Sequence, residues 1–389
     1  MQLRSHAYVA PAPEGRDPLS LDSLRPPDLM LFAAVAALVG IGLMMIFSAS
    51  SATAYAAHHD TAFYLKRQLM WLAVALVAAF GAYRCDYRKL RRLAGPALCF
   101  AFITVIAVLV PHVGLVSGGA RRWIGIGPLS FQPSEFAKLA LVIYLAAALT
   151  TKGERVRAFA GGIFPLLLVS GLLAVCVLKE PDMGTASLLL FVALAMLFVA
   201  GARLPHLLAT VLVMVPGATL SVVTSKYKLA RVLAFVDPFK DRQDTGYHIV
   251  QSLYALGSGG AMGLGLGASR QKFSYLPEQY TDFIFAILGE ELGLVGTLAV
   301  IALFVLFTQR AIRIALGAPD RFGFLLAMGC TFAIVIQAFI NIGVVTSSWP
   351  VTGVPLPFVS FGGSSLIVSL VCVALLLNIG RHRGERRAR

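Results

Sequence analysis

Ten apolar segments that are long enough, or nearly long enough, to span a lipid bilayer constrain the fold of this chain more than any other feature. Of its 389 residues, 58% are hydrophobic and only 13% are charged, so the polar surface cannot cover a soluble globule of this size. The sequence therefore predicts an all-α polytopic membrane protein with about ten transmembrane helices and a large extracytoplasmic loop between helices 7 and 8. The segments cover approximately residues 28–49, 68–84, 93–111, 136–150, 162–178, 183–202, 204–224, 282–307, 322–347 and 364–380.

Lysine and arginine residues are distributed unevenly among the connections. If the N-terminus is inside the cell, the basic connections 84–92, 151–161 and 308–321 and the basic C-terminal tail all lie in the cytoplasm, as the positive-inside rule requires. This distribution accounts for the net charge of +14 without a nucleic-acid partner, and we expect none. The sequence therefore predicts a multi-pass membrane protein with both termini in the cytoplasm.

The chain divides into three parts by composition. Residues 1–27 contain five prolines and several charges, which indicates a disordered cytoplasmic leader rather than a cleavable signal peptide. Residues 28–380 form a single membrane domain with an extracytoplasmic loop at 225–281, and residues 381–389 form a basic cytoplasmic tail. Within the loop, residues 226–236 and 246–256 place apolar residues at helical spacing, which predicts two short helices on the membrane surface.

The end of this loop carries Asp282, a carboxylate at the point where the polar loop enters an apolar helix. Thr281 is expected to cap the helix and Asp282 to lie in its first turn, where the helix dipole favours negative charge. A structural role at the helix start would explain the acid equally well. However, Gly289 and Gly293 lie within about 20° of Asp282 on a helical wheel, so this face can approach another backbone closely. Asp282 is therefore expected to point into a crevice.

The connection 118–138 combines glycines with Arg121, Arg122 and Trp123, and then begins a helix that contains Glu135 and Lys138. Glu135 and Lys138 are three residues apart and therefore lie one turn apart on that helix. An exposed ion pair at a helix start would be worth only a few tenths of a kcal/mol. Lys138 lies far enough into the span to need a partner, which favours a functional pair.

Three further stretches on the same side of the membrane carry candidate substrate contacts. Asp182 lies in a tight turn, 179–185, where it could also simply open the following helix. Arg270 and Lys272 follow a glycine-dense run whose backbone amides could cradle a phosphate, although glycine runs also form ordinary flexible loops. Ser360 and Ser364 end a proline-rich turn that is expected to line the same crevice, because irregular backbone at membrane depth needs protein or water around it.

Glu290 and Glu291 lie about two turns further along the helix after Asp282, inside the predicted span. Carboxylates within a membrane usually face the protein interior and find partners. At least one of the two is therefore expected to be buried against a hydrogen-bonding group.

Four stretches of this sequence resemble the motifs of the SEDS family (shape, elongation, division and sporulation), and the resemblance covers nearly all of the chain after the leader. Residues 256–260 and 265–273 look more like the division member of the family than the elongation member. The stretches read Gln132-Pro-Ser-Glu-Phe-Ala-Lys138, Glu180-Pro-Asp-Met-Gly-Thr185, the run from Tyr275 to Gly293, and Pro355-Leu-Pro-Phe-Val-Ser-Phe-Gly-Gly-Ser-Ser365.

This resemblance implies a peptidoglycan glycosyltransferase that polymerises lipid II, an undecaprenyl-linked precursor, at the outer face of the cytoplasmic membrane. It also implies a class B penicillin-binding protein (a transpeptidase) as partner, other division proteins, and a place at the division septum. The family's essential loop aspartate corresponds to Asp282, and its functional Glu and Lys pair corresponds to Glu135 and Lys138.

The residues themselves meet the demands of such a reaction. A sugar hydroxyl that attacks an anomeric carbon needs a base, and Asp282 is the best-placed carboxylate, which its helix-start position is expected to keep ionised. The departing pyrophosphate needs fixed positive charge, for which Lys138 and the arginines named above are candidates, or a divalent cation such as Mg²⁺ or Mn²⁺. A single carboxylate base without a nucleophile favours direct displacement with inversion.

Two other classes of protein remain open on the sequence alone. Charges within a membrane also mark transport pathways, so a lipid II flippase is one alternative. A non-catalytic scaffold for division proteins is another, and a role in elongation would keep the same chemistry. The clustering of charges at the outer side and the lack of a convincing internal repeat favour the enzyme.

Overall fold

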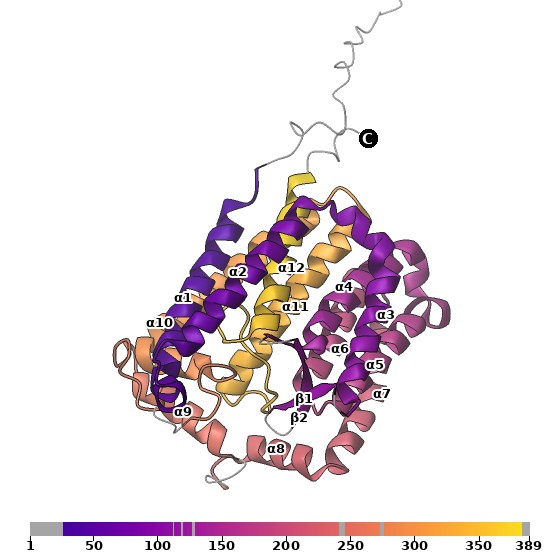
Figure 1. The fold of residues 1–389 in the computed structure, drawn as a ribbon. Helices are drawn as coiled ribbons and strands as arrows, with labels where there is room; N and C mark the ends of the chain where they lie inside the picture. Colours follow the sequence, from indigo (N-terminus) through magenta and orange to yellow (C-terminus); the bar gives the residue numbers. More distant parts are fainter. Residues whose placement is uncertain are drawn as a thin grey trace, which may run out of the picture.

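The computed structural model describes residues 26–111, 113–117, 120–126, 129–240, 246–272 and 276–382. Most of the predicted leader and all but the first two residues of the predicted tail lie outside these ranges. The described chain is a helical bundle with a small sheet at one end (Figure 1).

The ten predicted apolar segments each coincide with a helix. Among the described residues, eight helices are long and apolar enough to cross a membrane, and two shorter apolar helical stretches are Met183–Val199 and Leu204–Gly217. The predicted helical membrane fold is thus confirmed. The ten helices are α1 (Leu29–His58), α2 (Phe63–Arg84), α3 (Leu90–Leu109), α4 (Pro133–Lys152), α5 (Phe164–Lys179), α6 (Met183–Val199), α7 (Leu204–Val223), α10 (Ile284–Leu316), α11 (Arg321–Val345) and α12 (Gly363–Arg381).

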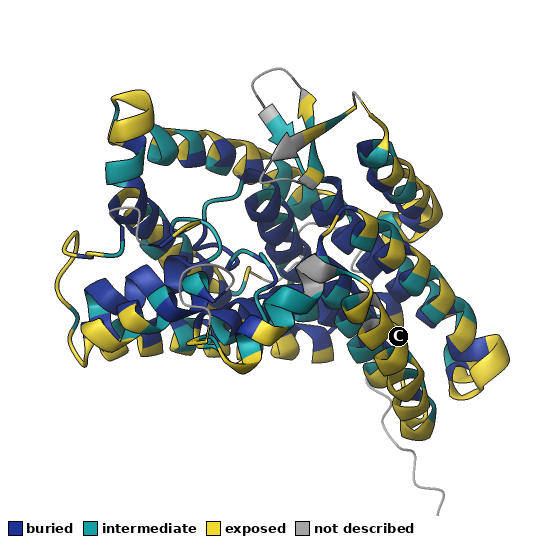
Figure 2. Cartoon of the chain, turned by 90° about the horizontal axis from the view of Figure 1, so that it is seen from below, coloured by how far each residue is buried: buried dark blue, intermediate teal, exposed yellow. Residues whose placement is uncertain are grey.

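Helices α4, α11 and α12 form the centre of the bundle, because most of their apolar residues are buried. Helix α2 packs along α12, α3 packs along α4, and α1 packs along α10. Figure 2 shows buried residues turned toward the inside and exposed residues along the outer helix faces. Many of those exposed side chains are large and apolar, as expected for a surface that faces lipid.

Two helices are present where the sequence predicts short helices in the loop, α8 (Lys226–Val236) and α9 (Tyr247–Gly259), and their place on the membrane surface stays a prediction. The connection between α3 and α4 forms an antiparallel sheet, which the sequence did not predict, from β1 (Gly114–Ser117), β2 (Ala120–Ile126) and β3 (Leu129–Phe131). The sheet, α8 and α9 lie at the end of the bundle opposite to the two ends of the described chain (Figure 1).

Helix α10 is interrupted at Gly293, whose φ of 65° and ψ of −162° are not helical. The interruption frees backbone groups that the glycine-rich loop after α9 satisfies: the amides of Leu264 and Gly265 donate to the carbonyls of residues 290 and 291. A Cβ at Gly293 would overlap the backbone of residues 261–263, so only glycine fits. The predicted close approach of another backbone at Gly289 and Gly293 is thus present. The predicted shared helix face with Asp282 was wrong, because Asp282 precedes the helix and Gly293 interrupts it.

Candidate active site

Asp282 lies in the turn that precedes α10 rather than in the first turn of that helix. Helix α10 begins at Ile284 after Phe283, which has no side-chain cap. The hydroxyl of Thr281 instead donates to Glu278, at 2.7 Å from Oε2. The prediction that Thr281 caps the helix was therefore wrong, because the helix begins two residues later than expected and Phe283 occupies the cap position.

The backbone around Asp282 is held by polar side chains from two other elements. The side-chain amide of Asn341 on α11 donates to the carbonyl of Asp282 at 2.7 Å. The hydroxyl of Ser360 donates to the carbonyl of Thr281 at 2.6 Å and accepts from the amide of Leu356 at 2.8 Å. The turn before α10 is thus tied to α11 and to the irregular segment 351–361.

The Asp282 carboxylate faces this irregular segment at Gly353. An added Cβ on Gly353, whose φ is 73°, would lie 3.4 Å from Oδ2 of Asp282. A larger residue at this position would be strained and would narrow the space beside the carboxylate. The predicted association of Asp282 with the proline-rich turn is confirmed.

Burial raises the pKa of Asp282 from its usual 3.8 to about 7. The negative charges of Glu278 and Asp182 contribute to the increase, while Arg122 and Arg231 oppose it. The expectation that the helix start keeps this acid fully ionised at neutral pH was therefore wrong. A carboxylate with a pKa near neutrality is a better general base than an ordinary aspartate, because basicity and deprotonated fraction are then both substantial.

Glu135 and Lys138 form an ion pair at the start of α4, with 2.8 Å between Nζ and Oε2. Both side chains are only 3% exposed, so this is a buried pair and not a surface one. The Lys138 ammonium also donates to the side-chain oxygen of Gln337 on α11. Gln337 in turn donates to the carbonyl of Pro355 at 2.9 Å, which connects the pair to the segment that faces Asp282.

Asp182 caps helix α6, as one of the two interpretations of its turn predicted. Its Oδ1 accepts from the amide of Thr185 at 2.9 Å and its Oδ2 accepts from the Thr185 hydroxyl at 2.8 Å. It also contributes to the electrostatic field at Asp282. Capping therefore does not remove Asp182 from the site.

Ser364 binds the loop that precedes α4. Its hydroxyl accepts from the backbone amide of Gln132 at 3.0 Å. The start of α12 is thereby tied to the start of α4, so Ser364 lies beside the Glu135–Lys138 turn.

Arg122 on β2 reaches over the turn between α5 and α6, where its guanidinium donates to the carbonyls of Glu180 at 3.0 Å and Pro181 at 2.6 Å. Arg121 is exposed and Trp123 is half-buried on the same strand. Burial and the nearby Asp182 raise the pKa of Glu180 to about 8, and its oxygens have no hydrogen-bond partner among the described residues. Glu180 is therefore largely protonated at neutral pH.

The glycine-rich loop binds the chain's own carboxylates. The amide of Arg270 donates to Glu290 at 3.0 Å, and the amides of Ser269 and Gln271 also face Glu290 or Glu291. The hydroxyl of Ser48 on α1 donates to both oxygens of Glu291, at 2.6 and 2.7 Å. The prediction of a buried, hydrogen-bonded carboxylate is confirmed for both glutamates.

The predicted phosphate-binding residues lie beside these internal contacts. The Arg270 side chain is exposed, and the Lys272 ammonium donates to the carbonyl of Gly267. Their contact with substrate stays a prediction.

Sequence reasoning missed Gln337, Asn341 and Arg231. Gln337 and Asn341 are each 1% exposed, and both connect candidate site residues to each other. The available signal was the pair of amides four residues apart in an otherwise apolar helix, which places both on one face. Arg231 lies on α8 and donates to the carbonyl of Val351 at 3.3 Å.

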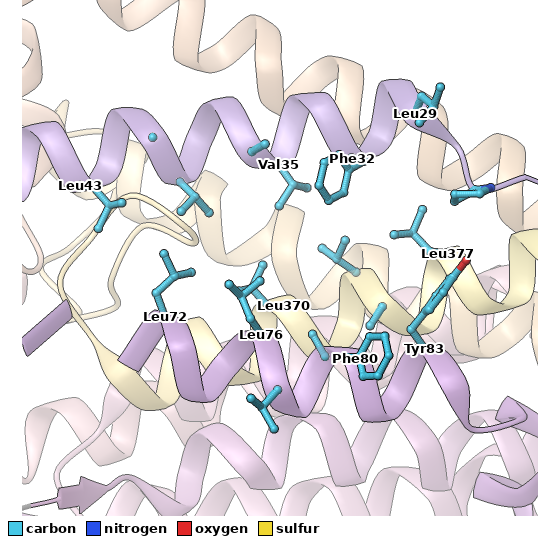
Figure 3. Close-up of a pocket in the computed structure, with 18 residues that line it drawn as sticks. Leu29, Phe32, Val35, Leu43, Leu72, Leu76, Phe80, Tyr83, Leu370 and Leu377 are labelled. Carbon is cyan, nitrogen blue, oxygen red and sulfur yellow. The ribbon is translucent and has the colours of Figure 1, made fainter. Parts of the chain in front are cut away.

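A separate apolar groove of about 950 Å³ lies between α1, α2 and α12 (Figure 3). Its walls include Phe32 and Leu43 from α1, Leu76 and Phe80 from α2, and Leu370 from α12. The lining side chains are almost entirely apolar, with the Tyr83 hydroxyl as the exception, so this groove offers no carboxylate or imidazole for acid–base chemistry. In the described part of the chain, no three histidines, cysteines or acids lie close enough to hold a metal ion.

Comparison with known proteins places this arrangement in a family. A family model described as "cell cycle protein", covering FtsW, RodA and SpoVE, matches residues 28–385. A probable peptidoglycan glycosyltransferase FtsW from Trichlorobacter lovleyi is 44% identical over 365 residues, which cover 92% of this chain and 96% of the relative. The stage V sporulation protein E of Bacillus subtilis is 43% identical over 356 residues, covering 92% and 97%.

Solved structures agree with the sequence comparison. A chain from a peptidoglycan synthase complex, solved to explain how polymerization and crosslinking are coordinated, matches with a TM-score of 0.76 and 31% identity, covering 92% of this chain and 98% of that chain. The rod shape determining protein RodA of Thermus thermophilus matches with a TM-score of 0.67 and 30% identity, covering 92% and 97%. The matched residues include Asp282 and the elements that surround it, and the chain therefore belongs to the SEDS family of FtsW, RodA and SpoVE proteins.

Proposed function

We propose that this protein is a peptidoglycan glycosyltransferase that polymerises lipid II during cell division. One observation carries the proposal: Asp282, with a pKa of about 7, lies opposite Gly353 at one end of a membrane bundle, where the charges of Glu278, Asp182, Arg122 and Arg231 act on it. Transfer of a sugar from a pyrophosphate requires a base whose pKa is near neutrality and positive charge that stabilises the departing group. The names of the relatives support the same chemistry.

In the proposed reaction, Asp282 accepts the proton of a sugar hydroxyl on one substrate while the hydroxyl oxygen bonds to the anomeric carbon of the other. The bond from that carbon to the polyprenyl pyrophosphate breaks on the opposite face, which inverts the configuration. Arg122 and Arg231, which act electrostatically on Asp282, and Lys138 are the candidate groups that stabilise the departing negative charge. Retention of configuration in the glycan would contradict this mechanism.

The orientation follows from the distribution of basic residues. The short helix Tyr87–Lys89 and the connection 153–163 join membrane helices at the end of the bundle that also holds the described chain ends, and both carry basic residues. With that end in the cytoplasm, Asp282 faces the outside. We place both termini in the cytoplasm and the protein at the division septum, with a class B penicillin-binding protein as the crosslinking partner.

The test is a reconstituted reaction. Purified protein, alone and with its transpeptidase partner, is incubated with lipid II, and the products are separated by size. Glycan strands formed by the complex are the expected result. Movement of lipid II between leaflets without any polymer would replace this proposal by the flippase alternative.

A further inference from the structure

Two buried amides on α11 bond to the Asp282 turn, to Lys138 and to the irregular segment 351–361. Gln337 and Asn341 are four residues apart, so their side chains leave the same face of the helix one turn apart. Each is 1% exposed, and burying a polar group costs free energy unless it is hydrogen-bonded. Their partners therefore indicate what the two amides are for.

Asn341 joins the Asp282 turn to the irregular segment. Its Nδ2 donates to the carbonyl of Asp282 at 2.7 Å and to the carbonyl of Val354 at 2.8 Å. Both N–H groups of one amide are thus used to hold two backbones that are 72 residues apart in sequence. The Asp282 carboxylate and Gly353, which face each other, belong to these two backbones.

Gln337 makes the same connection for Lys138. Its side-chain oxygen accepts from the Lys138 ammonium, and its Nε2 donates to the carbonyl of Pro355 at 2.9 Å and to the hydroxyl of Ser365 at 3.2 Å. Pro355 directly follows Val354, so the two amides hydrogen-bond to adjacent carbonyls of one segment. Lys138 and the backbone of Asp282 are therefore both held by hydrogen bonds from side chains of α11.

We propose that Asn341 and Gln337 are positioning residues that hold Asp282 and Lys138 in the geometry of the reaction. This inference rests on the proposed function, in which Asp282 is the base. Neither amide needs to touch substrate, because each acts through the group that it holds. A misplacement of about 1 Å can cost roughly 10²-fold in rate, so loss of either amide should lower kcat far more than it changes KM.

Changing the charge at position 341 should shift the pH–rate profile. A residue that only stabilises the fold would not produce such a shift. The charged groups that influence Asp282 are Glu278 on its own loop, Asp182 on α6, Arg122 on β2 and Arg231 on α8. None of these changes in a variant of Asn341. Asn341→Ala should loosen the turn and expose the partly buried Asp282 further, which should move the acid limb of the pH–rate profile to lower pH. Asn341→Asp places a second negative charge beside the turn and should move that limb to higher pH.

The experiment measures kcat, KM and the pH–rate profile of glycan formation by the complex for Asn341→Ala, Asn341→Asp, Gln337→Ala and a control. The control is Thr331→Val, since Thr331 is also buried on α11 and, among the described residues, its hydroxyl bonds the carbonyl of Ala327 in its own helix and no other group. We expect a fall of about 10²-fold in kcat for both alanine variants, opposite shifts of the acid limb at position 341, and a near-normal control.

Two outcomes would overturn the inference. One is that Asn341→Ala and Gln337→Ala polymerise like Thr331→Val. The other is that both position-341 variants lose activity in proportion to their loss of folded protein, with the acid limb unmoved. A separate result would contradict the proposed function, namely glycan formation by an Asp282→Asn variant. An inactive Asp282→Asn variant beside fully active amide variants refutes only the inference.

Discussion

Removal of the Lys138 ammonium should destabilise the protein far more than removal of an exposed lysine. Lys138→Met keeps most of the side chain's apolar length but leaves the Glu135 carboxylate buried without its cation. Removing one partner of a buried pair typically costs about 3–5 kcal/mol, whereas exposed pairs are worth about 0–1 kcal/mol. Because both side chains are buried, we expect the larger loss, that of a buried pair.

The chain provides a matched control at Lys66. Lys66 and Asp60 lie 2.7 Å apart, close to the 2.8 Å of the buried pair, but their side chains are 68% and 35% exposed. The free energy of unfolding in detergent micelles should therefore fall by less than about 1 kcal/mol in Lys66→Met. A double variant, Glu135→Gln with Lys138→Met, should recover much of the loss because no buried charge remains.

The three variants together test whether the Glu135–Lys138 pair is buried or solvated. Equal losses of unfolding free energy in Lys138→Met and Lys66→Met would show that the Glu135–Lys138 pair is solvated. The pair would then be no more than a helix-start interaction. A double variant as unstable as Lys138→Met would show that the loss comes from packing and not from the unpaired carboxylate.

Three further outcomes are expected. Glycan formation should increase as pH rises through about 7, because the pKa of Asp282 is raised and only its deprotonated form is a base; a rate independent of pH between 5 and 8 would contradict this. Gly293→Ala should lower the yield of folded protein, seen by size-exclusion chromatography, because a Cβ would overlap the glycine-rich loop and φ is 65°; Gly257→Ala, where nothing lies within 4 Å, should not. Single cysteines placed at positions 240 and 385 of a cysteine-free protein should be labelled from outside and only from inside, respectively; equal labelling from outside would contradict the topology.

The helices were predictable because their signal is local. Apolar length and helical spacing depend only on neighbouring residues, so residues 226–236 were predicted as a helix and α8 spans the same residues. The start of α10 was not predictable in the same way. Thr281 has the chemistry of a cap, but the turn continues to Phe283 and the helix begins at Ile284, and no local signal in the sequence marks that boundary.

The site was predictable as a set of residues but not as a geometry. Asp282, Glu135 and Lys138 could be selected because a charged group near lipid is costly and is usually kept for a function. The sheet that positions Arg122 depends on pairing between β1 and β2, and three-residue strands such as β3 carry little periodic signal. The glycine-rich loop had the composition of an anion site, and tertiary structure fills it with Glu290 from the same chain.

The central claim is that Asp282 is the base of a glycan polymerase, and Asp282→Asn tests it most directly. Asparagine keeps the size of the side chain and removes its negative charge and basic oxygen. The variant complex is supplied with lipid II at the outer face, so that a defect in flipping would be bypassed. We expect the variant to insert and to bind its partner while glycan formation falls by about 10² to 10⁴-fold, the usual cost of losing a general base. Polymerisation at the rate of the unmodified protein would contradict the account.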